Sequence, residues 1–328
     1  MAGPLVTGFL LRRLGASFLL LLLVLTTVFF VLHLIPGDPI QGFESDSRLT
    51  AEQRQHLLEI YGLDRPLPVQ YLAWLSSVAL RWDWGTSLSQ QRAVSAALGE
   101  AVRPTALLVG AALAVEYLAA LLLGVAAALK RGSTLDHAIR FFSLLLYSQP
   151  PFWLGLMAIL LFSYVWPVLP ASHMHSVDAD LLSPAGRLLD LLRHLALPAL
   201  TLGLWNAGGT SRFLRASLIE VMSQDYIRAA RAKGLSERRV VWIHGLRNAT
   251  VPLIQVFAIS LPALLSGSLI MEVVFSWPGF GRLIFLAIQT RDYPLVLGVT
   301  ALSATAVILG NLLADVLHAL TDPRARDA

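Results

Sequence analysis

The chain has 328 residues, of which 56% are hydrophobic and 14% are charged, and its formal net charge is +4. An ordinary globular protein carries about 25% charged residues, so this composition excludes a water-soluble fold and predicts contact with lipid. The absence of cysteine excludes a disulfide framework and a thiolate metal site. Nucleic-acid binding is disfavoured, because Lys and Arg cluster at the ends of apolar runs.

Six apolar stretches are long enough to cross a hydrocarbon core, which takes about 20 helical residues. The third contains Pro150 and Pro151, which predict a kink or a break, and the fourth is diluted by Asn206 and by Gly208-Gly209. The pattern predicts an all-α, polytopic membrane protein forming one transmembrane domain over residues 1–328. The expected spans are Leu14–Ile35, Thr105–Leu129, Phe141–Trp166, Leu195–Leu218, Leu253–Phe275 and Leu295–Leu320. We interpret the first as an uncleaved anchor, because it is longer than a signal core.

The placement of Lys and Arg predicts the orientation of the spans. With the N-terminus in the cytoplasm, 15 of the 25 basic residues fall inside, and six of the other ten lie in one long outside loop. Long loops cross the membrane largely regardless of charge, so the informative ratio is 15 to 4. Both termini are therefore expected on the cytoplasmic side of the membrane.

The long outside loop, residues 36–103, is expected to fold as a small helical cap on the outer membrane face. Thr50 and Gln53 form a capping-box pattern for a short helix that Gly62 can end. A second helix is predicted over residues 69–80, and nearby tryptophans suit a surface that is half apolar and half wet.

The cytoplasmic segment between the fourth and fifth spans, residues 220–250, carries the most information. A helix is predicted from about Gln224 to Lys233, with Gly234 as the left-handed residue after its end and Ser236 as the cap of a second helix. Alanines leave parts of the first helix nearly bare, and such a helix can enter a groove on a partner. The alternative is a solvated basic loop that merely obeys the positive-inside rule.

This segment resembles the EAA loop of binding-protein-dependent ABC importer permeases, in its peptide/nickel branch. The loop pattern is matched at Ala229, Ala230, Gly234 and Leu246, whereas Arg228, His244 and Arg247 depart from the general pattern and look like the peptide/nickel branch. The resemblance covers nearly the whole chain and looks like the first of two permease subunits. It includes Arg12-Arg13, Pro36-Gly37-Asp38-Pro39, Gly62-Leu63-Asp64-Arg65-Pro66-Leu67, Asp225-Tyr226-Ile227, Phe275-Ser276-Trp277-Pro278-Gly279-Phe280-Gly281-Arg282, Arg291-Asp292-Tyr293-Pro294 and Asp322-Pro323-Arg324.

The resemblance implies a subunit of an ATP-driven importer, in the inner membrane of a bacterial cell, that forms half of a translocation pathway. Its implied partners are a second homologous permease, one or two ATP-binding subunits that alone bind ATP, and a substrate-binding protein. Peptides are the leading substrate class, with nickel or metal chelates, glutathione and sugars as alternatives. The residues implied to contact the ATP-binding subunit are Asp225, Tyr226, Arg228, Ala229, Ala230, Lys233, Gly234, Arg247 and Asn248.

Polar groups inside spans are costly and are therefore functional candidates. Glu116, Asn206 and Asp315 are the candidates for the pathway. For the two carboxylates, the alternative is an interhelical hydrogen bond or an ion pair with Arg212 or Arg215. Glycines at 203, 208 and 209 allow the fourth span either to pack closely or to unwind.

Other classes of protein find less support. His173 and His175 could suggest a metal site, but loop histidines seldom form one, and we predict none. No His-Glu-x-x-His, Gly-x-Ser-x-Gly or Gly-Lys-Ser/Thr motif occurs, which disfavours an intramembrane enzyme and an intrinsic ATPase, so no cofactor is expected. A self-sufficient secondary transporter would show repeated halves, and none is visible.

Overall fold

The structure is a computed structural model that describes residues 4–34, 64–250 and 268–321, together with single residues between 50 and 59 and at 253, 256 and 257. Side chains are described within these ranges from residue 12 to residue 313. Within the described residues the fold is all-α, and the only β-pairing is one isolated bridge between Thr86 and Ala93. The chain forms two compact units, Met1–Thr105 with Pro278–Ile308, and Ala106–Trp277 with Leu309–Ala328.

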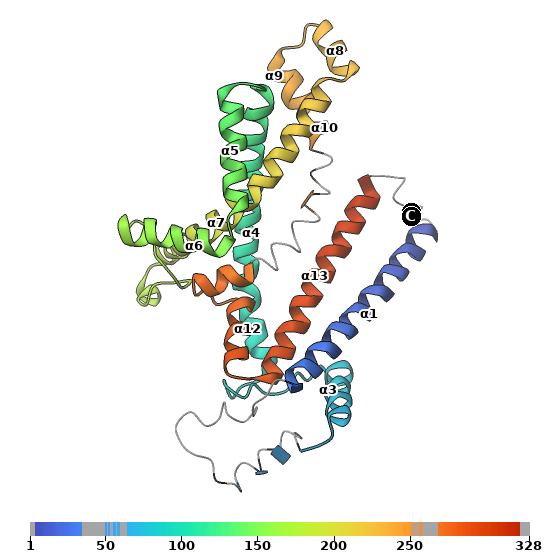
Figure 1. Ribbon diagram of the computed structural model, residues 1–328, viewed down its shortest axis with the longest axis vertical. Helices are drawn as coiled ribbons and strands as arrows, with labels where there is room; N and C mark the ends of the chain where they lie inside the picture. Colours follow the sequence, from blue (N-terminus) through green and yellow to red (C-terminus); the bar gives the residue numbers. More distant parts are fainter. Residues whose placement is uncertain are drawn as a thin grey trace. The chain divides into compact units, whose positions relative to one another are not determined.

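The first unit is built around the apolar helix α1, Pro4–Leu34. Helix α3, Leu67–Arg81, begins after Pro66 and packs on the end of α1, where Thr26 Oγ1 lies 2.6 Å from the Tyr71 hydroxyl. The helix predicted over residues 69–80 is thereby confirmed, and its place on the outer membrane face stays a prediction. The unit also contains the start of α4, helix α12, Phe280–Gln289, and most of α13, Tyr293–Thr321 (Figure 1).

A fully buried carboxylate, Asp292, organises the turn between α12 and α13. Its Oδ1 accepts a hydrogen bond from the Leu295 amide at 3.1 Å, which caps the first turn of α13. Its Oδ2 accepts from Ser87 Oγ at 2.5 Å, from Ser89 Oγ at 2.7 Å and from the Ser89 amide at 2.9 Å. Asp292 therefore ties the segment before α4 to the start of α13.

The second unit contains most of α4, Val94–Leu129, followed by α5, Thr134–Ser148, and α6, Pro151–Ile159, which continues as a π-helical turn over Leu160–Val165. A short 3-10 turn, Ala179–Leu181, leads into α7, Pro184–Met222. The chain then forms α8, Asp225–Ala232, α9, Glu237–Arg239, a π-helical turn over Val240–Gly245, and α10, Leu246–Ala249.

Helix α7 packs closely on two neighbours at its glycines. A Cβ atom on Gly203 would lie 2.6 Å from the Ala112 carbonyl oxygen of α4, and one on Gly208 would lie 2.5 Å from the Ser143 carbonyl oxygen of α5. Both contacts leave no room for a side chain, and α7 is helical throughout this region. Of the two alternatives for these glycines, the structure therefore shows close packing.

Four described helices are long and apolar enough to cross a membrane, namely α1, α4, α7 and α13. The predicted third span is broken as expected, because α5 and the helix that follows Pro150 meet at 100°. Most of the predicted fifth span, 253–275, and most of the predicted first cap helix, 50–62, lie outside the described residues. The chain is a polytopic, all-α membrane protein.

Candidate functional site

The segment between α7 and α10 has the predicted helix–glycine–helix layout. Helix α8 follows Gln224 as its N-cap residue and ends at Ala232 with Lys233 as its C-cap residue, so the expected helix over 224–233 agrees to within one residue at each end. Gly234 has a φ of +78°, which is the left-handed conformation expected after the helix. Ser236 occupies the N-cap position of α9, although its side chain makes no capping hydrogen bond.

A small apolar core of its own holds this segment together. Ile227 and Ala230 of α8 are buried against Val240, with Met222 and Leu235 packed around them. Ala230 therefore points into the segment, whereas the neighbouring Ala229 is exposed. The segment, which we call the coupling loop (residues 223–249), is a folded unit and not a floppy connector.

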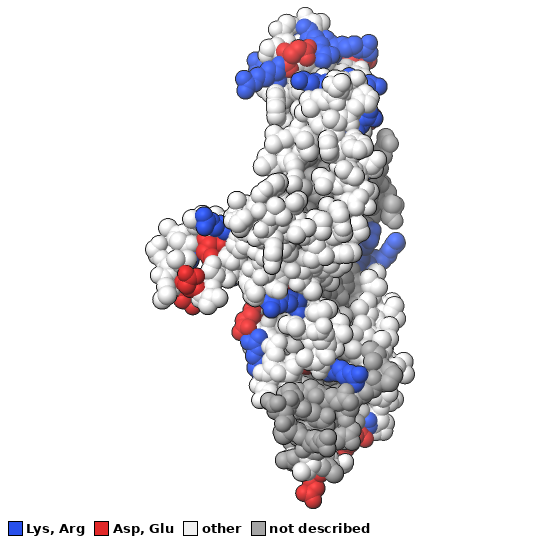
Figure 2. Space-filling model, turned by 60° about the vertical axis from the view of Figure 1, so that its left-hand side comes forward, with Lys and Arg blue, Asp and Glu red and all other residues white. Residues whose placement is uncertain are grey.

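The outer face of α8 is polar and unusually exposed. The side chains of Asp225 and Arg228 are 89% and 72% exposed and form an ion pair with each other, and Tyr226 is 44% exposed. A second pair joins Arg231 to Glu237 at 2.7 Å across the Gly234 turn. Figure 2 shows Lys and Arg gathered over this end of the second unit, where Arg228, Arg231, Lys233, Arg238 and Arg239 are all exposed.

The second half of the coupling loop is anchored to α7. Gly245 fits beneath Met222, since an added Cβ would lie 2.8 Å from its sulfur atom. Ala249 is fully buried beside Leu214 and Leu218, and its carbonyl oxygen accepts a hydrogen bond from Ser217 Oγ at 3.1 Å. Among the predicted contact residues, Arg247 and Asn248 lie on the exposed side of this anchored half.

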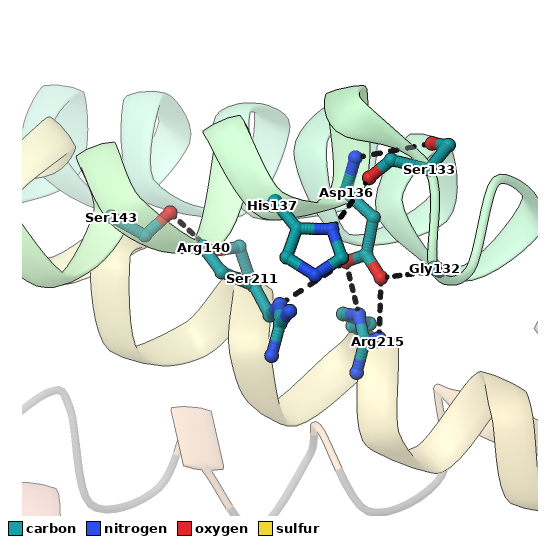
Figure 3. A network of polar contacts seen from close by, with 8 residues as sticks. All are labelled: Gly132, Ser133, Asp136, His137, Arg140, Ser143, Ser211 and Arg215. Atoms are coloured by element: carbon teal, nitrogen blue, oxygen red, sulfur yellow. Dashed lines mark hydrogen bonds and ion pairs between the residues drawn. The ribbon is translucent and has the colours of Figure 1, made fainter.

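A buried carboxylate fastens α5 to α7 in the same unit (Figure 3). Asp136 is 1% exposed, and its two oxygens accept hydrogen bonds from Arg215 Nε and Nη2, each at 2.7 Å. The Gly132 amide donates to the same carboxylate at 2.9 Å, and Arg140 lies 3.5 Å away. This two-pronged pair fixes the α7 segment from which the coupling loop emerges.

The pair of Asp136 and Arg215 is a feature that sequence reasoning missed. Ser133 caps α5 and accepts a hydrogen bond from the Asp136 amide at 3.3 Å, so the Ser133-x-x-Asp136 pattern marked the start of a helix. The local sequence pattern indicates neither that Arg215 is the partner of Asp136 nor that Asp136 is buried.

Comparison with known proteins shows what kind of chain carries this loop. Residues 120–327 match the family described as binding-protein-dependent transport system inner membrane component, and residues 6–102 match the N-terminal model of the same kind of component. The chain belongs to this family of ABC importer permeases.

Curated relatives cover the chain almost end to end. It is 38% identical to the di/tripeptide transport system permease protein DppB of Pseudomonas aeruginosa, over 97% of this chain and 98% of that protein. It is 35% identical to the oligopeptide transport system permease protein AppB of Bacillus subtilis, over 97% and 98%. The glutathione transport system permease protein GsiC of Salmonella choleraesuis is 38% identical, over 97% and 99%.

Two of the three predicted pathway residues of this permease form described hydrogen bonds, one between helices and one within a helix. Glu116 of α4 is fully buried and accepts a hydrogen bond from Thr210 Oγ1 of α7 at 2.6 Å, which is the interhelical bond left open as an alternative. Asn206 donates to the Leu202 carbonyl one turn earlier. Asp315 lies within α13, but its side chain is outside the described residues, so its pathway role stays a prediction.

The two histidines in the segment before α7 of the permease contact neighbouring polar groups. His175 Nδ1 lies 3.1 Å from Asp190 Oδ2 on α7, and the Ser176 hydroxyl donates to the same carboxylate at 2.5 Å. His173 Nδ1 lies 2.9 Å from the Ser172 hydroxyl. Among the described side chains, no group of three or more potential ligands is placed to hold a metal ion. These contacts account for the position of both rings.

Proposed function

We propose that this permease forms half of the translocation pathway of an ATP-driven peptide importer. Relatives over the full length are named for di/tripeptides, oligopeptides and glutathione, which supports peptides ahead of nickel chelates and sugars. The proposed assembly adds a second homologous permease, one or two ATP-binding subunits and a substrate-binding protein. The chain itself has no catalytic role and binds no cofactor.

One observation carries the proposed coupling role, namely the exposed α8 face on a separately folded loop. The loop fills its own core with Ile227, Ala230 and Val240, so the outward side of α8 is free for a partner. Asp225, Tyr226, Arg228, Ala229 and Lys233 form that side and would contact the ATP-binding subunit. A helix presented in this way fits a groove on another protein. Ala230 and Gly234 would set the shape of the loop.

The substitution Gly234→Val tests this role. A β-branched residue at a φ of +78° is strained by roughly 1–2 kcal/mol, which is small for the helical bundle and large for the turn after α8. We expect normal membrane abundance, weaker co-purification of the ATP-binding subunits and no peptide uptake.

Gly234→Asn is the matched control, because asparagine tolerates the left-handed conformation and no atom lies within 4 Å of an added Cβ at this position, so uptake should stay near that of the wild type. Ala229→Asp should act like Gly234→Val by placing charge on the exposed face. Wild-type uptake by both Gly234→Val and Ala229→Asp, with ATP-binding subunits still bound, would contradict the coupling role.

The proposed orientation places both termini and the coupling loop in the cytoplasm and α3 on the outer side. Ser76 of α3 and Ser236 of the coupling loop are both exposed. In the cysteine-free chain, Ser76→Cys should react with a membrane-impermeant maleimide in intact spheroplasts, and Ser236→Cys only after lysis. Labelling of both before lysis would refute the orientation.

Hydrolysis of ATP should require the partner subunits, because the sequence has no Gly-Lys-Ser/Thr phosphate-binding loop. Phosphate release by the purified chain should stay at background and rise only when the ATP-binding subunits are added. Turnover by this polypeptide alone would contradict the proposal.

A further inference from the structure

The first unit contains a pocket of about 540 Å³ that neither the family nor the coupling role explains. It is bounded by the end of α1, by α3, by residues 83–88 and by the start of α13. All of these segments belong to the first unit, so the pocket lies within one compact body. Its size is in the range of sites that hold small molecules.

One wall of the pocket is a cluster of aromatic rings. Phe29 stacks on His33 with ring centroids 4.3 Å apart and lies 5.9 Å from the ring of Trp74. Tyr293 meets His33 edge-on at 5.2 Å, and Trp84 also lines the pocket. Aromatic faces of this kind attract organic cations, ammonium groups included.

Charged groups of both signs line the same pocket. Arg65, Asp83 and Glu59 are lining residues, and none of them forms an ion pair with another described residue. Asp83 Oδ1 accepts a hydrogen bond from the Gly85 amide at 2.9 Å, whereas Oδ2 accepts none from the described part of the chain. The indole nitrogen of Trp74 is buried and also has no described partner.

We propose that this pocket binds a small zwitterion through its ammonium group. The ammonium lies against the aromatic wall and is neutralised by Asp83 and Glu59, while Arg65 faces the negative group of the same ligand. Opposite charges that flank aromatic rings without pairing with each other fit a ligand that carries both signs.

Two kinds of ligand carry both an ammonium group and a negatively charged group. A short peptide offers an α-ammonium and a carboxylate, and this source rests on the proposed function. A phosphatidylethanolamine headgroup offers an ammonium and a phosphate, and it would reach the pocket from the bilayer. Both would use the same residues, so the experiment must separate them.

Binding is measured on the full-length chain in detergent by calorimetry with the dipeptide Ala-Phe and with N-acetyl-Ala-Phe. Lipid binding is measured by native mass spectrometry after addition of phosphatidylethanolamine or phosphatidylglycerol. The test variant Asp83→Asn keeps the Oδ1 acceptor for Gly85 and removes the charge. Asp64→Asn is the matched control, since Asp64 is an exposed acid that precedes α3 in the same unit and does not line the pocket.

Aromatic variants form a second matched pair. Trp84→Leu shortens the aromatic wall, whereas Trp82→Leu changes a tryptophan that is 78% exposed and lies outside the pocket. We expect the ammonium-bearing probe to bind, and both Asp83→Asn and Trp84→Leu to weaken its binding about tenfold, because each removes part of the contact with the ammonium group. The two controls should bind as the wild type does.

Saturable binding of Ala-Phe but not of its acetylated form identifies a peptide, and selective binding of phosphatidylethanolamine identifies the lipid. Absence of binding by both, or equal binding by wild type and Asp83→Asn, overturns the proposal. Uptake of Ala-Phe by the assembled importer tests the proposed function separately from the pocket. Wild-type uptake without binding at the pocket would refute the proposed pocket alone. Binding at the pocket without uptake would refute the proposed peptide-importer function alone.

Discussion

Two buried carboxylates, one in each unit, fasten distant segments by different chemistry. Asp136 of the second unit joins α5 to α7 through the guanidinium group of Arg215, with Arg140 nearby. Asp292 of the first unit joins α13 to the segment before α4 through two serine hydroxyls and two amides. The first carboxylate has a charged partner, and the second is held by neutral donors among the described residues.

The difference follows from what surrounds each carboxylate. Arg215 is 19% exposed and Arg140 44% exposed, so the cations near Asp136 keep part of their hydration. Asp292 is fully buried at the end of a helix, where the amides and the positive end of the helix dipole stabilise a negative charge. We call the Asp136 contacts the charged clamp and the Asp292 contacts the neutral clamp. The charged clamp depends strongly on one residue, Arg215, whereas the stabilisation from the neutral clamp is shared among several donors.

Removal of Arg215 should have the largest effect. Arg215→Met leaves the Asp136 carboxylate buried without its main partner, which typically costs about 3–5 kcal/mol. The free energy of unfolding of the purified chain in mixed micelles should fall by about that amount. The double variant Asp136→Leu/Arg215→Met should recover most of the loss, because it removes both charges. A loss equal to that of the single variant would show that packing, not charge, holds α5 to α7.

Removal of the neutral clamp should cost less. Asp292→Ala leaves the hydroxyls of Ser87 and Ser89 and the Leu295 amide without their acceptor, which we estimate at about 2–3 kcal/mol. The same unfolding measurement checks it, and Asp292→Asn should lose less because it retains an acceptor for Leu295. An effect as large as that of Arg215→Met would remove the distinction between the two clamps.

The smallest effect is expected for Arg140, the outer cation of the charged clamp. Arg140→Gln should lower the free energy of unfolding by less than about 1 kcal/mol, because partly exposed ion pairs contribute little. The effect should shrink further in high salt, where exposed charges are screened. A loss above 2 kcal/mol would mean that Asp136 depends on both arginines.

Features governed by a few neighbouring residues were predictable from the sequence. Helix α8 ends shortly before Gly234, because glycine readily adopts the left-handed conformation that follows a helix. The break at Pro150 follows from the missing amide hydrogen and fixed φ of proline. The second span was predicted to begin at Thr105, and the helix that contains it, α4, begins earlier, at Val94, with Pro104 inside the helix. Hydropathy reports contact with lipid, whereas residues 94–101 are helical because Val94, Leu98 and Ala101 are buried by packing.

Features that join distant residues were not predictable from one sequence. Glu116 was recognised as a costly group, but its partner Thr210 lies 94 residues further along the chain. Asp136 and Arg215 are 79 residues apart. The outward side of α8 was only partly foreseen, since Ala230 lies inside the loop and Ala229 outside it. The sequence pattern is the same for both alanines, so only the three-dimensional packing shows which of them is buried.

Helix α7 has a mechanical consequence. Pro198 lies inside the helix, and residues 199–222 after it, at 1.5 Å each, form a rod about 36 Å long that ends at the coupling loop. The glycine contacts hold this rod against α4 and α5, which leaves little room to bend it at those points. If the rod pivots at one end, a tilt of about 8° moves the other end by about 5 Å. Helix α7 is thus shaped as a lever arm, which converts a small rotation into a displacement as large as a peptide side chain.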